Sequence, residues 1–197
     1  VDVGDTRTTE HSFGFAHRAG GIPNSPTTRF AIASGSKAFT ALAILRLIED
    51  GVLRRDQPVR ETLGEDLPLV DDRVTIEHLL AHTSGIGDYL DESDDGEITD
   101  YVLSLPVHVF ETAEDFLPVL ADRDQKSAPG EKFAYNNGGY VILALVIERV
   151  AGESFPDVVN RLVITPARLT STSYPRSDEL SAGSAAHYLF DEGDRTN

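Results

Sequence analysis

The sequence predicts a mixed α/β fold of the α+β type, in which short strands come first and helices dominate the rest of the chain. Residues 1–33 combine brief apolar alternation at Phe13 and Phe15 with Gly-Gly and Asn-Ser-Pro turn signals, a pattern typical of extended strands. After residue 34, longer apolar runs of helical length end at glycines. Two or three strands alone make a poor sheet, so we expect some strands of the complete sheet to be missing from this chain.

Six segments after residue 34 are predicted as helices from their apolar spacing and their capping residues. They cover about 35–50, 75–82 with Thr75 as N-cap, 97–104, 111–122, 139–152 with Gly152 as the stop, and 154–162 with Ser154 as N-cap. The first is apolar on nearly all sides, which predicts burial in the core. Residues 87–97 are acidic and predict a solvated loop, whereas the Ser/Thr/Pro-rich chain from Thr165 onward predicts irregular structure.

The composition excludes several classes of function. The 197 residues include 17 Lys and Arg against 33 Asp and Glu, which gives a formal charge of −16. Such an acidic chain is a poor partner for nucleic acid or an anionic membrane surface, and it has no run of 18 apolar residues that could span a bilayer. Cysteine is absent, which removes disulfides, thiolate metal sites and a cysteine nucleophile. These features do not choose between cytoplasm and export, so the localisation stays open.

The first candidate for chemistry is the pair Ser34 and Lys37, at the start of the first predicted helix. Serine at a strand-to-helix junction is most often an N-cap, and a capping box would place Glu or Gln three residues later. This sequence has Lys37 there, although a cation in the first turn opposes the helix dipole and only 3 of the 17 basic residues are lysines. Residues at i and i+3 share a helix face, so the amine can reach the hydroxyl and activate it as a nucleophile.

The second candidate is Tyr135 with Asn137, directly before the apolar helix predicted over 139–152. In ordinary roles Tyr135 would be an aromatic residue of a strand, and Asn137 would cap the helix. In a chemical role, a tyrosine hydroxyl beside a lysine can transfer protons, and Asn137 could bind both the lysine and a substrate amide.

Three segments carry a resemblance to a known family: RFAIASGSKAFTALAILRLIEDG, VTIEHLLAHTSGI and FAYNNGGYVILALVIERVAG. Together and in this order they resemble the penicillin-recognising serine hydrolases, in the branch of class C β-lactamases, D,D-carboxypeptidases, D-amino-acid amidases and β-lactamase-like esterases. That family has a Ser-x-x-Lys motif at the start of a buried helix and a Tyr-x-Asn motif roughly a hundred residues later. The resemblance implies a β-lactamase/transpeptidase-like fold, in which a helical domain lies beside an antiparallel sheet.

The resemblance also implies roles for the candidate residues. Ser34 would be the acylated nucleophile, Lys37 and Tyr135 would exchange protons with it, and either of the two could be the base. Asn137 would contact the substrate, and the backbone N–H of Ser34 would form one arm of the oxyanion hole. The reaction would need neither a metal nor an organic cofactor. The partner would be a small molecule or peptide, namely an ester, a D-amino-acid amide or peptide, or a β-lactam, and we favour an ester or peptide over a β-lactam.

One motif of the family has no counterpart here. The family carries a Lys/His-Thr/Ser-Gly type motif on a strand near its C-terminus, which supplies the second oxyanion arm, and nothing similar follows Asn137. We therefore expect residues 1–33 to supply the N-terminal strands of the sheet domain and residues 34–197 the nucleophile helix and helical domain, with the C-terminal half of the sheet domain missing. A complementary C-terminal chain could complete the site. A non-catalytic binding or scaffold protein of the same fold is the alternative.

Two histidines and one tyrosine complete the candidates. His78 and His82 lie at i and i+4 on one predicted helix, a spacing compatible with two metal ligands. No third ligand and no zinc-hydrolase glutamate accompany them, so we predict no metal at this pair. The resemblance implies a structural role near the site for this segment. Tyr89, in the loop that follows, is a candidate for lining a substrate cleft.

Overall fold

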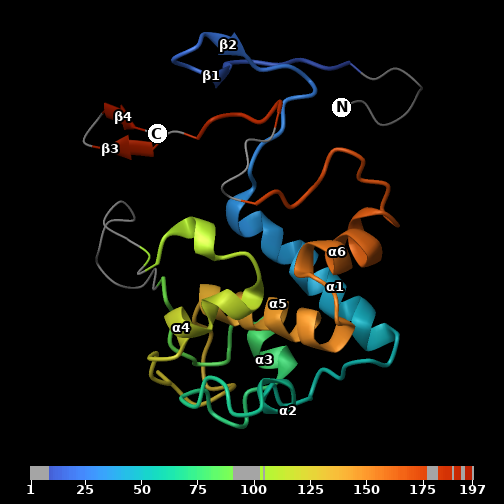
Figure 1. Ribbon diagram of the computed structural model, residues 1–197, viewed down its shortest axis with the longest axis vertical. Helices are drawn as coiled ribbons and strands as arrows, with labels where there is room; N and C mark the ends of the chain where they lie inside the picture. The colour runs from blue at the N-terminus through green and yellow to red at the C-terminus, as the bar shows by residue number, and fades with distance from the viewer. Residues whose placement is uncertain are drawn as a thin grey trace. The chain divides into compact units, whose positions relative to one another are not determined.

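The chain divides into two compact units, which are described separately. The computed structural model describes residues 9–90, 103, 105–176, 182–187, 189–191 and 194–196 (Figure 1). One unit comprises Val1–Ala33 with Glu179–Asn197, and the other comprises Ser34–Asp178. The sequence places residues 34–197 in one helical domain, whereas in the structure the last part of this range groups with the N-terminal segment.

The first unit contains two short antiparallel hairpins. β1 (Phe15–His17) pairs with β2 (Ile22–Pro23), as the turn residues between them predict. β3 (Leu189–Asp191) pairs with β4 (Asp194–Thr196). The prediction of irregular structure from Thr165 to the C-terminus is therefore wrong at its end, because strands of three residues are too short for apolar alternation to reveal them.

Main-chain hydrogen bonds connect the two ends of the sequence within this unit. The backbone N–H of Ala185 donates to the carbonyl of Arg29 at 2.8 Å, and that of Ala186 donates to the carbonyl of Ala16 at 2.7 Å. These bonds link residues that are more than 150 positions apart, which explains why no local sequence pattern predicts the grouping.

The second unit is helical and follows the predicted order. Its elements are η1 (Ala33–Ser36), α1 (Lys37–Glu49), α2 (Arg60–Leu63), α3 (Ile76–Leu80), η3 (Val107–Val109), η4 (Ala113–Phe116), α4 (Leu117–Leu120), α5 (Asn137–Ala151), α6 (Phe155–Val159) and the π-helical η5 (Asn160–Ile164). The predicted helices near 35–50, 75–82, 111–122, 139–152 and 154–162 are confirmed, with Thr75 and Ser154 as side-chain caps. The helix predicted at 97–104 lies outside the described residues, apart from position 103.

α5 is the central helix of this unit. It contacts α1, α2, α3, α6 and η4, and Figure 1 shows it running through the middle of these elements. Its side chains Leu143, Val146 and Ile147 are completely buried. Truncating a fully buried Leu or Ile to Ala costs about 2–5 kcal/mol, so α5 holds the unit together. It ends where Gly152 adopts a left-handed φ of 66°, a conformation that glycine adopts without steric cost.

α1 is less buried than its composition predicts. It buries one face through Thr40, Ala43, Ile44 and Leu47, while Leu42 is 51% exposed. The expectation of burial on all sides is thus wrong for α1, because apolar character shows what a helix can bury and not how many neighbours surround it. No helix among the described residues has the length and apolarity needed to cross a membrane.

Candidate active site

Ser34 lies in the single turn η1 that leads into α1. The preceding residue, Ala33, has a φ of 43°, in the left-handed region that a residue with a β-carbon seldom adopts. Ser34 is not the N-cap of α1, because that position is occupied by Ser36. Ser36 makes no side-chain cap hydrogen bond either, so α1 begins without a serine cap, and the Ser34 hydroxyl remains available for other contacts.

Lys37, the first residue of α1, turns its side chain toward Ser34. Its Nζ donates hydrogen bonds to Ser34 Oγ at 3.0 Å and to Asn137 Oδ1 at 2.8 Å. It also lies 4.9 Å from the ring centroid of Tyr135 and 5.8 Å from that of Tyr140, within the range of cation–π attraction. The lysine that opposes the helix dipole thus has compensating partners.

Tyr135 completes the cluster. Its hydroxyl donates to Ser34 Oγ at 2.7 Å, across 101 positions of sequence. The predicted residues Ser34, Lys37, Tyr135 and Asn137 are therefore brought together by α1 and by the start of α5. The segment that carries Tyr135 is extended without forming a strand, and the Ala134 N–H next to it donates to the carbonyl of His82 at 2.8 Å.

The start of α5 is fixed by two polar side chains. Asn136 is the N-cap, and its Oδ1 accepts from Gly139 N–H at 2.6 Å. The carboxylate of Asp88 accepts from the backbone N–H groups of Asn137 and Gly138. An anion at a helix N-terminus is stabilised by unpaired N–H groups and by the helix dipole. Asp88 thereby holds the backbone of Asn137, the residue whose side chain binds Lys37.

Asp88 corrects one expectation from the sequence. Residues 87–97 are predicted to form a solvated acidic loop, yet the Asp88 residue is only 6% exposed. Residues 91–97 lie outside the described part of the chain. The sequence does not single out Asp88, because nothing near it in the sequence distinguishes a carboxylate that caps a distant helix from the other acidic residues of the run.

His82 packs against the rings of the cluster. Its imidazole centroid lies 4.6 Å from that of Tyr135 and 5.0 Å from that of Tyr140, and its Nδ1 accepts from Asn136 N–H at 3.1 Å. Burial lowers the pKa of His82 below its ordinary value of 6.5, and the nearby charge of Lys37 lowers it further. A neutral imidazole suits this position, because only the unprotonated Nδ1 can accept the Asn136 N–H.

The backbone of His82 ends α3. Its φ is 55°, and Thr83 N–H donates to His78 O at 2.8 Å while His82 N–H donates to Leu79 O at 3.2 Å. This is the Schellman arrangement, whose left-handed position is usually glycine. A histidine occupies this position instead, and its imidazole makes the contacts with Tyr135, Tyr140 and Asn136 that a glycine could not make.

Both histidines of the predicted pair use Nδ1 to accept hydrogen bonds from the backbone. His78 Nδ1 accepts from Thr75 N–H at 3.2 Å as part of the capping box of α3, and His82 Nδ1 is bonded to Asn136. Among the described residues, no group of three or more His, Cys, Asp or Glu side chains is placed to hold an ion. The part that His82 plays beside the tyrosines was anticipated only as a structural role near the site.

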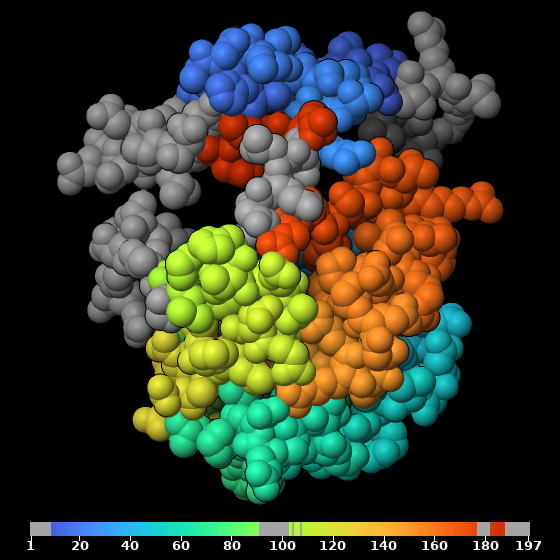
Figure 2. Space-filling view, viewed as in Figure 1, coloured from blue at the N-terminus to red at the C-terminus, as the bar shows by residue number. Residues whose placement is uncertain are grey.

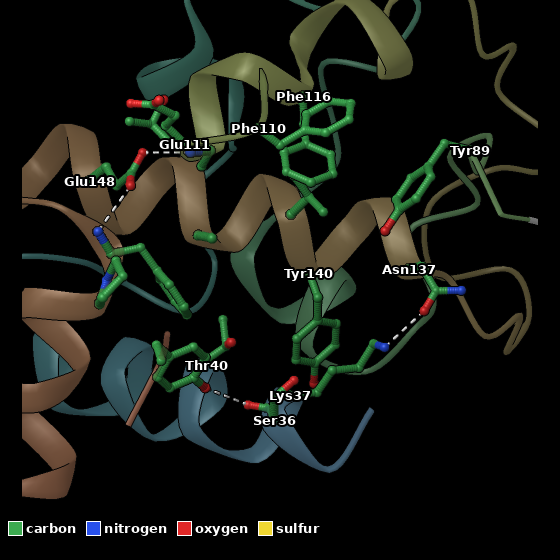
Figure 3. A pocket seen from close by; sticks show the side chains of 17 residues that line it. Ser36, Lys37, Thr40, Tyr89, Phe110, Glu111, Phe116, Asn137, Tyr140 and Glu148 are labelled. Atoms are coloured by element: carbon green, nitrogen blue, oxygen red, sulfur yellow. Dashed lines mark hydrogen bonds between the residues drawn. The ribbon is translucent and has the colours of Figure 1, made fainter. Parts of the chain in front are cut away.

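Tyr89 and Tyr140 lie on either side of the start of α5. Both line a cavity together with Lys37 and Asn137 (Figure 3). The Tyr140 hydroxyl donates to the carbonyl of Leu80 at 3.1 Å, and burial, followed by the influence of Tyr135, raises its pKa. Sequence reasoning missed Tyr140, which lies one turn after Asn136 and so faces the same side of α5.

The chain is similar to known proteins over nearly its whole length. The family model described as Beta-lactamase matches residues 1–196. Penicillin-binding protein 4* of Bacillus subtilis (strain 168) is 33% identical over 183 residues, covering 91% of this chain and 38% of that protein. The crystal structure of a penicillin binding protein from Bacillus halodurans is 40% identical with a TM-score of 0.85, covering 94% of this chain and 56% of that one. The structure of EstCE1, a hydrolase with promiscuous acyltransferase activity, is 30% identical with a TM-score of 0.74, covering 93% of this chain and 49% of that one.

These matches cover nearly all of this chain but between 38% and 56% of each of the three relatives. The resemblance read from the three sequence segments is confirmed, as is the β-lactamase/transpeptidase-like fold. The family match over residues 1–196 and the solved relatives lead to one conclusion: the chain belongs to the beta-lactamase family of penicillin-recognising serine hydrolases.

Proposed function

We propose that this chain carries the nucleophile of a serine hydrolase that works through an acyl-enzyme on Ser34. The observation that carries the proposal is the convergence of two proton-transfer groups on one hydroxyl: Lys37 Nζ at 3.0 Å and Tyr135 OH at 2.7 Å from Ser34 Oγ. Both distances lie within the reach required of a nucleophile and its base. A serine that served only to cap a helix would have no need of either partner.

The chemistry follows in two steps. In the first, Ser34 Oγ attacks a substrate carbonyl carbon, its proton passes to Lys37 or Tyr135, and the alcohol or amine leaves with a proton. In the second, water attacks the acyl-enzyme, and the proton of Ser34 is restored. Because both partners donate to Ser34 Oγ here, one of them must give up its proton before it can act as the base, and either assignment is compatible with the distances.

Asn137 would have two tasks in this scheme. Its Oδ1 holds Lys37 at 2.8 Å, while its Nδ2 donates to the carbonyl of Leu90 at 3.1 Å. The first contact keeps the lysine directed at Ser34. We propose that the amide also contacts the substrate, with Tyr89 beside it in the wall of the cavity.

The substrate would be an ester, a D-amino-acid amide or peptide, or a β-lactam. The similarity to EstCE1, a hydrolase with promiscuous acyltransferase activity, supports acyl transfer, and the similarity to penicillin-binding proteins supports recognition of a β-lactam. We favour an ester or peptide over a dedicated β-lactamase reaction. No metal or organic cofactor is needed for either step.

The test is covalent labelling. The protein would be treated with a fluorescent penicillin or with a reactive fluorophosphonate, and the adduct located by intact-mass and peptide mass spectrometry. We expect labelling at Ser34 that is lost in Ser34→Ala and kept in the control Ser171→Ala, an exposed serine. The same reaction with a C-terminal fragment of a relative would test whether a complementary chain is required. Absence of labelling in every combination would overturn the proposal and favour a non-catalytic binding protein.

A further inference from the structure

We propose that His82 is a positioning residue for Tyr135, and that it holds Tyr135 against Ser34 only while its imidazole is uncharged. This inference rests on the proposed function, because it gives His82 a part in the proton transfer at Ser34. It goes beyond that function in one respect: the rate of the reaction becomes dependent on the charge of a side chain outside the hydrogen-bonded cluster around Ser34.

His82 binds the backbone on both sides of Tyr135. Its carbonyl accepts from Ala134 N–H at 2.8 Å, and its Nδ1 accepts from Asn136 N–H at 3.1 Å. The residue between these two donors is Tyr135, whose segment forms no strand and so has no ladder of backbone hydrogen bonds to hold it. Two bonds from one residue, one of the main chain and one of the side chain, therefore locate the backbone of Tyr135.

The imidazole of His82 also supports the ring of Tyr135. The two ring centroids are 4.6 Å apart, and the ring planes meet at 33°, a distance typical of packed aromatic pairs. The hydroxyl of the same tyrosine donates to Ser34 Oγ at 2.7 Å. The tyrosine cannot turn away from the serine without losing contacts with His82, because His82 holds its ring and the backbone on either side of it.

His82 is itself held in place by its surroundings. The backbone N–H of Gly130 donates to the carbonyl of Thr83 at 2.8 Å, so the chain directly after His82 lies beside the segment that leads to Tyr135. Figure 2 shows yellow residues near position 125 next to green residues of the earlier chain on this face of the unit. The left-handed φ of 55° at His82 is a conformation that such contacts must impose.

The hydrogen bond at Nδ1 requires a neutral imidazole. A protonated imidazole carries a hydrogen on both nitrogens, so Nδ1 could no longer accept from Asn136 N–H and two donors would face each other. Burial lowers the pKa of His82 below 6.5, and the charge of Lys37 lowers it further. The imidazole is therefore neutral at neutral pH and becomes charged only in acid.

Charged and titratable groups face His82 from each element packed against it. They are Lys37 of α1, Asp88 of the loop after α3, Tyr135 of the extended segment and Tyr140 of α5. Lys37 opposes a charge on the imidazole, whereas Asp88 favours one. The carboxylate of Asp88 is already bound by two backbone N–H groups at the start of α5. Burial raises the pKa of Tyr140, so its hydroxyl stays uncharged when His82 titrates.

Protonation of His82 would have two opposing effects at Ser34. The new charge would repel the ammonium of Lys37 and so favour the neutral amine, the form that can act as a base. Protonation would also break the bond to Asn136 N–H and release Tyr135. We expect the second effect to dominate, because a reacting group misplaced by about 1 Å can cost about 100-fold in rate.

Two replacements of His82 separate its acceptor from its backbone conformation. Asparagine and glycine both adopt a left-handed φ readily, and only asparagine offers a side-chain oxygen in place of Nδ1. The rate of Ser34 labelling by the fluorophosphonate would be measured at increasing reagent concentration, which separates the chemical step from reagent binding. At neutral pH we expect His82→Gly to slow the chemical step by about 10- to 100-fold with unchanged reagent binding, and His82→Asn to retain most of the native rate.

The pH profile of labelling tests the requirement for a neutral ring. From about pH 7.5 to about pH 5, the native chain should lose at least about threefold more rate than His82→Asn, because asparagine does not titrate. The matched control is His78→Asn. His78 Nδ1 also accepts a backbone N–H, that of Thr75 at 3.2 Å, so this variant should keep the native profile. Circular dichroism at each pH restricts the comparison to folded protein.

A readout that needs no reaction keeps the two proposals distinguishable. With ¹³C-labelled tyrosine rings, the NMR signals of Tyr135 should shift as His82 titrates and stay constant over the same pH range in His82→Asn. Native labelling kinetics in His82→Gly, a loss confined to reagent binding, equal pH profiles of the native chain and His82→Asn, or Tyr135 signals that ignore His82 would overturn the inference. Failure of the native chain to be labelled at Ser34 would overturn only the proposed function, and the Tyr135 signals would still decide the role of His82.

Discussion

Replacing Asp88 by Asn tests whether the buried carboxylate holds the start of α5. In the native chain, Oδ1 accepts from Gly138 N–H at 2.8 Å, and Oδ2 accepts from the N–H of Asn137. An asparagine has one carbonyl oxygen, so one of these N–H groups would face an amide NH₂ and lose its acceptor. Leaving one buried donor unpaired costs about 1–3 kcal/mol.

The loss of charge adds a second cost. An anion at a partly buried helix N-terminus contributes up to about 2 kcal/mol. Together the two effects predict that Asp88→Asn lowers the free energy of unfolding by about 2–4 kcal/mol. Because Asp88 holds Asn137 and Asn137 holds Lys37, the rate of Ser34 labelling should also fall by about 10- to 100-fold, as expected for a misplaced reacting group.

Urea unfolding followed by far-ultraviolet circular dichroism is the appropriate assay, because the chain contains no tryptophan for fluorescence. The matched control is Asp56→Asn, a carboxylate whose side chain is 87% exposed in a 3.7 Å pair with Arg54. Such surface pairs contribute at most about 1 kcal/mol. If Asp88→Asn proved as stable as the control variant with the same denaturant slope, the capping role of Asp88 would be refuted.

Three further predictions concern pH and one ionic cluster. The pKa of His82 is lowered in the folded chain, so the unfolded chain binds a proton more readily and the free energy of unfolding should fall as the pH drops from 6.5 through the lower folded pKa. His82→Asn, which keeps a left-handed backbone accessible, should flatten this pH dependence when stability is measured by urea titration. If the variant showed the same dependence of stability on pH, the role assigned to His82 would be contradicted. Burial raises the pKa of Tyr174 from 10.0 to about 12, so its contribution to stability should be lost as the pH rises between these values, and Tyr174→Phe should reduce the alkaline loss. Arg149 binds both oxygens of Glu114 at 2.7 and 2.8 Å and Asp66 at 2.6 Å. Arg149→Lys should therefore lower the free energy of unfolding by about 2 kcal/mol, because a lysine cannot bind these carboxylates with a planar guanidinium. Equal thermal stability of the lysine variant would show that the planar guanidinium is unimportant.

The parts of the fold that the sequence predicts are those set by local chemistry. Thr75, Ser154 and Gly152 lie at helix ends because a side-chain oxygen or a positive φ is needed there, and these requirements are visible in a short window of sequence. The pairing of Ser34 with Lys37 is likewise local, since the two residues are one helical turn apart.

What the sequence does not reveal is set by distant partners. Asp88 looks like its acidic neighbours until α5, nearly fifty residues later, is placed against it. The hairpin β3–β4 is too short for a pattern. The bonds from Ala185 and Ala186 to the N-terminal segment depend on residues more than 150 positions away. The bonds of Asp88, Ala185 and Ala186 are tertiary contacts, which leave no pattern in a short window of sequence.

Backbone strain connects the local and distant features of the site. Among the described residues, Ala33, Leu67, His82 and Arg168 are the non-glycine residues with positive φ, a conformation that costs roughly 1–2 kcal/mol for a residue with a β-carbon. Two of them adjoin the cluster: Ala33 directly precedes Ser34, and His82 packs on Tyr135 at 4.6 Å. Glycine at position 82 would remove the strain. It would also remove the imidazole that packs on the rings of Tyr135 and Tyr140 and that accepts the Asn136 N–H. Strain of this kind persists where surrounding contacts impose it, so the positions of Tyr135 and Asn136 are fixed before any substrate arrives. If Ser34 is the nucleophile, as proposed, its two partners within 3.0 Å are then already in position, and no binding energy is needed to assemble them.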